Sequence, residues 1–421
     1  MGRRVFFPGS RPKRFAVAVS GLVLASCVME AEPVQDSWQA GLESVLATDG
    51  ARAPGAAIAI VRDGQVLWAL AAGAAAFDAA GQAPVRALQA ATPVRAASMS
   101  KLAVALTAGA LAQQGRLDLD APIAAALPRA PRHPLDPDAP ITLRQLLSHT
   151  SGVCDPARYW AELGEDFYAL FRDEAAWCEH RPGEGFAYSN LGYALAAGVL
   201  EAASEERFDR LARRYALIPA GLPGAGFNWS GVERSVRDSG GALHRWSDGA
   251  WRVQIDSASM LAGEGPVVLV QPGHVLEDYQ PGLNGSLMSP QGGLRANVIE
   301  LALLAEAFAP GGPGEALAEP VWRGDAGPGL RAWATGPQFL EPGQVPGRPD
   351  LTAIGHPGQA WGLYGGAWYL PGLNASIAYF VTGEDPDEPK PYDPVSGLTA
   401  GETALFALAL DWLDAHDSAR P

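Results

Sequence analysis

The hydrophobic positions of the chain predict β-strands near both of its ends. Residues 56–62 are apolar and rich in β-branched side chains, and Asp63-Gly64 separates them from a second apolar run. Two such runs joined by an Asp-Gly turn are typical of a β-hairpin. Residues 366–370 and 376–381 flank a turn that contains Pro371-Gly372. This pattern predicts a second hairpin near the other end of the chain.

Helical spacing of apolar residues marks the segments between and beyond these hairpins. Asp36 precedes a run with helical spacing and is expected to cap a helix. Residues 98–115 and 297–308 are the clearest helices of the middle region. A final helix is expected after Thr399 and Glu402, whose spacing is that of a capping box.

This order of elements predicts an α+β fold. An antiparallel sheet is built from the N- and C-terminal segments and flanked by helices, and a mainly helical lobe is inserted between them. The sheet lobe is expected over residues 36–90 and 345–416, and the helical lobe over residues 91–344. Two lobes are expected because a single core rarely grows past about 300 residues. The cleft between them is the expected binding site.

Composition narrows the class of function. The 421 residues include 31 Lys+Arg and 46 Asp+Glu, which gives a formal net charge of −15. Nucleic-acid binding needs a basic face, so no nucleic-acid partner is expected. The chain is 48% hydrophobic, enough for a large core, and its 3 Cys are too few for a disulfide scaffold. Lys101 is the only Lys between positions 14 and 389.

The start of the chain indicates export. Residues 1–14 are rich in Arg, and a short apolar run follows them over residues 15–25. This pattern is typical of a secretory signal peptide, and the run is too short for a permanent transmembrane helix. We predict a signal peptide over residues 1–26, a tether over residues 27–35, and one folded domain over residues 36–416.

Leu24-Ala25-Ser26-Cys27 resembles the bacterial lipoprotein signal, in which Cys27 would carry the lipid. A lipid anchor would then be the only membrane contact of a periplasmic or outer-envelope protein. A cleavage site with an incidental Cys is the alternative, and Arg3-Arg4 also resembles a twin-arginine export signal. An oxidising compartment favours a disulfide between Cys154 and Cys178 over two buried free thiols.

Three short motifs could carry chemistry. Ser98 and Lys101 lie three residues apart at the start of a predicted helix, which places both side chains on one face. A desolvated Lys can lose its proton and activate a hydroxyl nucleophile. The alternative is a capping Ser beside a solvent-facing Lys. Tyr188 and Asn190 precede an apolar helical stretch, from which a phenol and an amide can point into one cleft.

The third motif is Gly355-His356-Pro357-Gly358-Gln359. Pro357 has no N–H, which predicts a sheet edge or the start of a strand. An edge beside a cleft can offer a backbone N–H to a developing oxyanion. Each of the three motifs is weak when taken alone.

The ordered set Ser-x-x-Lys, Tyr-x-Asn about 90 residues later and His-x-Gly resembles the serine β-lactamase and penicillin-binding-protein superfamily, in particular its class C β-lactamase-like branch. Residues 117–120, 146–152 and 289–294 also resemble that family. The resemblance covers roughly residues 40–415 and implies a β-lactamase/transpeptidase-like fold. It also implies cleavage of an ester or amide in a small-molecule or peptide substrate through an acyl-enzyme, with no metal or organic cofactor.

The resemblance implies a role for each motif residue. Ser98 would be the acylated nucleophile, and Lys101 would accept or relay its proton. Tyr188 would act as general base and then protonate the leaving group. Asn190 would hold the amide of the acyl side chain. The backbone N–H groups of Ser98 and Gln359 would form the oxyanion hole.

One departure from the family affects the expected substrate. His356-Pro357-Gly358 stands where β-lactamases commonly have Lys-Thr-Gly, so a hydroxyl is missing and the cation is only partial near neutral pH. Weaker carboxylate recognition is expected, which favours an esterase, amidase or D-peptidase. A true β-lactamase or D-alanyl-D-alanine carboxypeptidase is one alternative, and a catalytically inactive binding protein is another. His149, within the family-like segment 146–152, is expected to be buried and hydrogen-bonded rather than catalytic.

Overall fold

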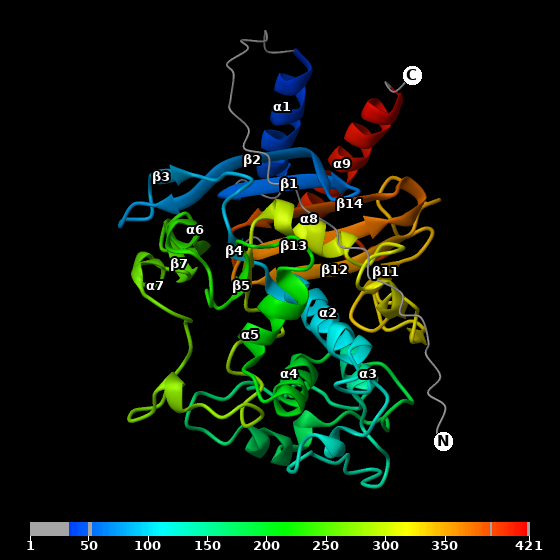
Figure 1. The fold of residues 1–421 in the computed structure, drawn as a ribbon. Coiled ribbons are helices and arrows are strands. Elements are labelled where there is room, and N and C mark those ends of the chain that lie inside the picture. The colour runs from blue at the N-terminus through cyan, green and yellow to red at the C-terminus, as the bar shows by residue number, and fades with distance from the viewer. Residues whose placement is uncertain (1–32, 49–52, 388–389, 419–421) are drawn as a thin grey trace, which may run out of the picture.

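A large sheet pairs a strand from the N-terminal region, β1, with one from the C-terminal region, β14 (Figure 1). The computed structural model describes residues 33–48, 53–387 and 390–418, so Cys27 and the predicted signal peptide lie outside the described residues. The large sheet has nine strands in the order β3-β2-β1-β14-β13-β12-β11-β10-β9. The predicted α+β fold, with an antiparallel sheet drawn from both terminal regions, is confirmed.

Both predicted hairpins are present in this sheet. The first joins β1 (Gly55–Arg62) to β2 (Gln65–Phe77), and the second joins β13 (Leu363–Leu370) to β14 (Ala375–Thr382). β1 also pairs with β14, from Gly55 opposite Thr382 onward. The remaining strands of the sheet are β3 (Pro84–Ala87), β9 (Trp322–Arg323), β10 (Ala332–Trp333), β11 (Gln338–Leu340) and β12 (Ala353–Ala360).

Three strands of the large sheet come from a part of the chain that was predicted to belong to the helical lobe. β9, β10 and β11 lie within residues 91–344, which the sequence analysis assigned to the helical lobe. These strands are two or three residues long, and hydrophobic alternation over so few positions gives no signal in a sequence. The division into two lobes at these boundaries stays a prediction.

The alternation of side chains along β1 builds a core on each face of the sheet. Ile58 and Ile60 are fully buried against α1 (Pro33–Thr48) and α9 (Ala400–Ser418), which cover one face. Each such side chain contributes about 1.5–3 kcal/mol through burial. The opposite face packs on α8 (Val298–Glu306), which confirms the helix predicted over residues 297–308.

One predicted helix start is confirmed and one is wrong. Thr399 and Glu402 exchange capping hydrogen bonds at the start of α9, with 2.9 Å from Thr399 N to Glu402 Oε2 and 3.3 Å from Glu402 N to Thr399 Oγ1. Asp36 does not cap the first helix, because α1 already begins at Pro33. Pro favours the first turn of a helix, where its missing N–H has no cost. The helix therefore also takes the last three residues of the predicted tether over 27–35.

The middle of the chain is mostly helical, and α2 (Ser100–Gln113) runs through it next to the sheet (Figure 1). The same part of the chain also forms two small sheets. The other helices are α3 (Leu143–Leu147), α4 (Asn190–Ser204), α5 (Phe208–Ala212), α6 (Arg234–Asp238) and α7 (Ala258–Ala262). The small sheets contain β4 (Val94–Arg95), β8 (Leu294–Ala296) and β5 (Gly226–Phe227), and β6 (Leu243–Ser247) with β7 (Ala250–Ile255).

Two absences hold for the described part of the chain. None of its helices is long and apolar enough to cross a membrane. No group of three or more His, Cys, Asp or Glu side chains in it could hold a metal ion.

Candidate active site

Ser98 lies in a tight 3₁₀ turn, Ala97–Met99, that leads directly into α2. Ala97 and Met99 are buried on either side of it, while Ser98 itself is only partly buried. Ala97 has a φ of 46°, a left-handed conformation that costs a residue with a Cβ roughly 1–3 kcal/mol. The surrounding core holds this strained turn, which presents the Ser98 hydroxyl at the end of the helix.

Lys101 lies one turn further along and is fully buried. Its Nζ donates hydrogen bonds to Ser98 Oγ at 3.2 Å, to Asn190 Oδ1 at 2.9 Å and to the Gln291 carbonyl at 3.0 Å. Burial lowers the pKa of Lys101 to about 7, with a smaller opposing effect from Asp155. A substantial fraction of the amine is therefore unprotonated near neutral pH and can accept a proton.

Tyr188 completes a group of three side chains around the nucleophile. Its phenol interacts with the Ser98 hydroxyl, and Lys101 Nζ lies 4.7 Å from the centre of its ring. Burial raises the pKa of Tyr188 above the usual value, so the phenol keeps its proton near neutral pH. The three motif residues thus meet from two distant parts of the chain.

The His149 ring packs against the Tyr188 ring. Its ring lies 4.4 Å from the Tyr188 ring, and its Nδ1 accepts a hydrogen bond of 3.0 Å from the Ser189 backbone N–H. The side chain is 2% exposed, and burial lowers its pKa well below the usual range. The prediction of a buried, hydrogen-bonded His is confirmed.

Asp155 is a site residue that the sequence analysis missed. Its carboxylate accepts hydrogen bonds from Ser189 Oγ, Asn190 N, Asn190 Nδ2 and Leu191 N at 3.1, 3.0, 2.8 and 2.8 Å. These donors form the start of α4, where a negative charge is favourable. Because Asp155 takes the Asn190 amide N–H, the Asn190 oxygen faces Lys101. Both ends of that amide are engaged within the protein, and its predicted contact with substrate stays a prediction.

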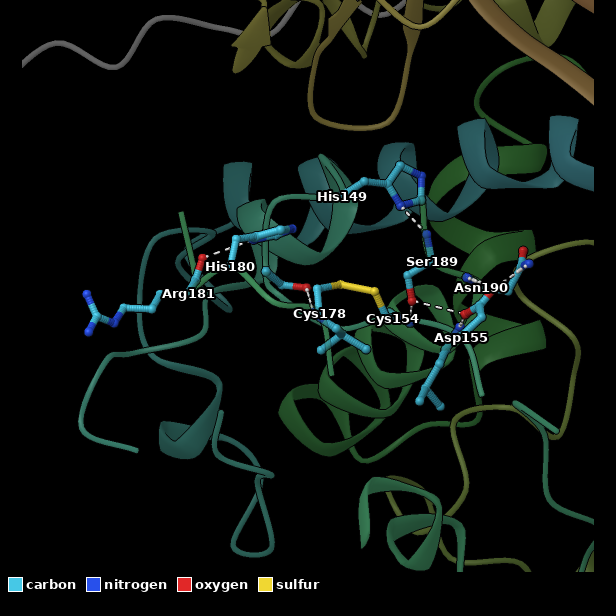
Figure 2. The surroundings of a disulfide bond; sticks show 12 residues. His149, Cys154, Asp155, Cys178, His180, Arg181, Ser189 and Asn190 are labelled. Carbon is cyan, nitrogen blue, oxygen red and sulfur yellow. Dashed lines mark hydrogen bonds between the residues drawn. A yellow bond between two sulfur atoms is a disulfide. The ribbon is translucent and has the colours of Figure 1, made fainter. Parts of the chain in front are cut away.

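A disulfide fixes the segment that carries Asp155. Cys154 and Cys178 are bonded, and the backbone N–H groups of these two residues donate to the Ala176 and Gly152 carbonyls, each at 2.9 Å. Figure 2 shows Asp155 next to this bridge, pointing toward Ser189 and Asn190. The bridge that the sequence analysis expected therefore also anchors the loop behind the active site.

The third motif lies in β12, whose free edge faces the nucleophile. β12 pairs with β13 from Ile354 to Ala360 but with β11 only as far as Gly355, so one edge is open from His356 onward. A Cβ at Gly358 would lie 2.9 Å from the Ala96 carbonyl, too close for any side chain. Gly358 is thus required for the close approach of β12 to the Ser98 turn. Pro357 was predicted at a sheet edge or the start of a strand, but it lies in the middle of β12, an inner strand of the sheet, on which one side is unpaired here because the pairing with β11 ends at Gly355.

His356 is not the partial cation that the sequence analysis expected. It is 1% exposed, and burial, together with the Lys101 charge, lowers its pKa to about 3. The neutral ring donates from Nδ1 to the Pro357 carbonyl at 2.5 Å. The sequence could not reveal this, because burial of the ring comes from aromatic neighbours such as Trp333, 5.2 Å away.

A cavity of about 230 Å³ opens beside the nucleophile. Its wall combines apolar and aromatic groups with a few polar ones, as is usual for small-molecule sites. Ser98, Tyr188, Leu330, Trp333, Gln338, His356, Pro357, Gly358, Gln359, Tyr392, Gly397 and Glu402 line it. Trp333 and Glu402 were not among the predicted site residues, because no motif marks them and they come from a short strand and a helix start.

Comparison with known proteins agrees with this geometry. A sequence model of the Beta-lactamase family matches residues 42–401. Esterase EstB of Burkholderia gladioli is 29% identical over 349 residues, which cover 76% of this chain and 83% of the esterase. Protein flp of Staphylococcus aureus is 29% identical over 166 residues, 37% of this chain and 31% of that protein. The chain thus spans about a third of the length of Protein flp.

The fold has solved counterparts as well. The crystal structure of D-amino acid amidase from Ochrobactrum anthropi SV3 covers 90% of this chain and 99% of its own, with a TM-score of 0.63 and 16% sequence identity. That likeness concerns the fold alone. Since the family match extends over most of the chain and the three motifs meet on the expected fold, the chain belongs to the β-lactamase family of hydrolases.

Proposed function

We propose that this protein is a serine hydrolase that cleaves an ester or amide through an acyl-enzyme on Ser98. The observation that carries the proposal is the Ser98 hydroxyl held between the Lys101 amine, at 3.2 Å, and the Tyr188 phenol. A nucleophile next to a base with a lowered pKa is the arrangement that covalent catalysis requires.

The pKa directions assign the proton transfers. Lys101, in its neutral form, takes the Ser98 proton as Oγ attacks the carbonyl carbon of the substrate. Tyr188 stays protonated and gives its proton to the leaving alcohol or amine as the scissile bond breaks, and Lys101 returns a proton to it. Water then attacks the acyl-enzyme by the reverse sequence and releases the acid. This differs from the sequence-based expectation, in which Tyr188 was the base.

The open edge of β12 supports the predicted oxyanion hole. Consecutive residues of a strand direct their N–H groups to opposite edges, so residues two positions apart share an edge. Pro357 has no N–H to give to β13, and Gln359, two residues on, shares its orientation toward the open edge. The Gln359 N–H and the Ser98 N–H are then the two donors for the developing negative charge.

Relatives and site chemistry together favour an ester or amide substrate. EstB is an esterase, and the amidase from Ochrobactrum anthropi acts on D-amino acid amides, so both bond types occur among similar proteins. The alternative of a β-lactamase or D-alanyl-D-alanine carboxypeptidase requires recognition of a carboxylate. The neutral His356 cannot supply this at the third motif.

A fluorophosphonate probe tests the proposal directly. The wild-type protein should be labelled on Ser98, and Ser98→Ala should abolish labelling without lowering the melting temperature. Folded wild-type protein that takes no label would instead support the catalytically inactive binding protein. A panel of 4-nitrophenyl esters, D-amino-acid anilides and nitrocefin then defines the bond that is cleaved.

We also propose that the protein is exported and carries a lipid on Cys27. The Cys154–Cys178 bridge supports an oxidising compartment, because such bonds rarely persist in the cytosol. Mass spectrometry of the mature N-terminus tests this proposal: a diacylglyceryl group on Cys27 supports it, and an unmodified terminus at another residue contradicts it.

A further inference from the structure

Arg95 lies next to the nucleophile and has no partner for its charge. It belongs to β4, three residues before Ser98, and is partly buried. Within the described ranges its guanidinium makes no hydrogen bond or ion pair, and its Nε is buried without a partner. In a chain with a formal net charge of −15, an unpaired cation at this position requires an explanation.

The neighbouring charges increase the excess of positive charge. Arg95 lies directly opposite Arg295 across the β4–β8 pair, and like charges in facing positions destabilise a sheet. The acid that could compensate both is Asp256, which is fully buried. Arg295 already forms an ion pair with Asp256. Arg295 Nε donates to Asp256 Oδ2 at 3.1 Å, and Arg295 Nη2 donates to Asp256 Oδ1 at 2.9 Å. Arg95 therefore has no counter-ion of its own.

The guanidinium of Arg95 faces the turn that carries Ser98. Its Nη2 lies 3.7 Å from the position that a Cβ would occupy at Gly292. The carbonyl carbon and oxygen of Ala97, the residue bonded to Ser98, lie 3.7 Å from the same position. A methyl group at Gly292 would make ordinary van der Waals contact with both, so the cation and the nucleophile turn both border this glycine.

Tyr159 is a second hydrogen-bond donor close enough to Arg95 for the two groups to interact electrostatically. Its phenol interacts electrostatically with Arg95 and with Tyr188, and within the described segments it has no hydrogen-bond partner. Burial and the Asp155 charge raise the pKa of Tyr159, so its O–H stays protonated. Burial and Arg295 lower the pKa of Arg95 to about 9, which leaves it charged at neutral pH. Neither Arg95 nor Tyr159 lines the 230 Å³ cavity, so the two side chains lie outside that part of the site.

We propose that Arg95 and Tyr159 form a carboxylate-binding subsite beside Ser98, which selects substrates whose acyl group carries a carboxylate. The proposal rests on the proposed function. An arginine fork and a phenol O–H match the two oxygens of a carboxylate. The bound anion would also offset the repulsion between Arg95 and Arg295. Carboxylate recognition would then reside on this side of the nucleophile instead of at the third motif.

Two esters that differ in one group test the proposal. The 4-nitrophenyl monoester of glutarate has a carboxylate where 4-nitrophenyl pentanoate has a methyl group, and the leaving group is the same. Wild-type protein should prefer the glutaryl ester in kcat/KM. Arg95→Gln should lower kcat/KM for the glutaryl ester roughly ten- to hundred-fold. Its kcat/KM for the pentanoyl ester should stay within about twofold of the wild-type value. Tyr159→Phe should have a smaller effect of the same kind.

The controls separate this subsite from general charge effects and from misfolding. Arg172→Gln removes the same charge from a side chain that is 78% exposed, and should not change the preference. Each variant is checked for its melting temperature and for fluorophosphonate labelling. Raising the salt concentration should weaken the preference of the wild type.

The outcomes also separate the two proposals. Wild type that hydrolyses pentanoyl and glutaryl esters equally well through Ser98 would overturn the subsite alone. If Arg95→Gln lowers kcat/KM for both esters by the same factor, Arg95 only supports the fold. That result would overturn the subsite as well. Failure of Ser98 to be labelled or to turn over either ester would overturn the proposed function itself.

Discussion

The Lys101 amine lies 3.2 Å from the Ser98 hydroxyl oxygen and is fully enclosed by protein. The helix spacing of three residues brings the two groups together, and enclosure lowers the pKa of the amine to about 7. The spacing in the helix and the burial of the amine therefore place a base next to a nucleophile.

Replacing Lys101 by Met should remove the base. Acylation by a fluorophosphonate or an ester should slow by roughly 10²- to 10⁴-fold, the usual contribution of general acid–base catalysis. Lys101→Arg is the matched control, because it keeps the charge but does not release its proton. It should be as slow as the Met variant, and a fast Arg variant would contradict the role of Lys101 as base.

The activity should depend on pH through the same group. Because the pKa of Lys101 is lowered to about 7, the base is lost to protonation below that pH. The value of kcat/KM for a neutral ester should fall about tenfold per pH unit as the pH drops below 7. A profile that stays flat from pH 5 to 8 would show that a different group activates Ser98.

The free energy of unfolding should depend on pH above the pKa of Lys101, whereas the activity depends on pH below it. Lys101 has its usual pKa in the unfolded chain, so between about pH 7 and 10 the unfolded state binds more protons than the folded state. The free energy of unfolding therefore rises with pH in this window. Urea titrations at several pH values should show a steeper rise for wild type than for Lys101→Met, and equal slopes would contradict the assigned pKa.

Asp155 should act as a positioning residue. Asp155→Ala leaves the backbone N–H groups of Asn190 and Leu191 without their acceptor, which should cost about 3 kcal/mol of unfolding free energy. It should lower kcat more than it raises KM, because Asn190 and Tyr188 lose their alignment. Asp173→Ala removes a carboxylate that caps a short 3₁₀ turn and serves as the control.

The disulfide should contribute to both stability and activity. Cys154→Ser with Cys178→Ser opens a link between residues 24 positions apart, which should cost roughly 3 kcal/mol. Activity should fall as well, because Asp155 follows directly after Cys154. Thiol titration of the unreduced protein in denaturant should find neither of these cysteines free, and two free thiols would contradict the bridge.

The parts of the fold that the sequence predicted are those with strong local signals. The hairpins at Asp63-Gly64 and Pro371-Gly372 and the capping box at Thr399 each depend on residues a few positions apart. Short strands such as β10, which contains Trp333, have no such signal. β10 pairs with β9 and β11, which are equally short, so no periodic run of residues marks any of the three.

The same distinction applies to the site. Ser98, Lys101 and Tyr188 belong to ordered motifs, so their residue types and spacing pointed to them. Asp155 and Arg95 have roles that depend on which charges surround them, and this is not visible in a linear pattern. The neutral state of His356 likewise depends on burial by groups that are distant in sequence.

The pairing of Gly55 with Thr382 has a consequence for how the enzyme is made. β1 leaves the ribosome more than 300 residues before the strand that covers its edge, since the two pair across 327 positions. Contacts of such long range slow folding, and an unpaired edge invites aggregation. One edge of β1 therefore stays open during most of synthesis, and a chain that stops before β14 should be insoluble.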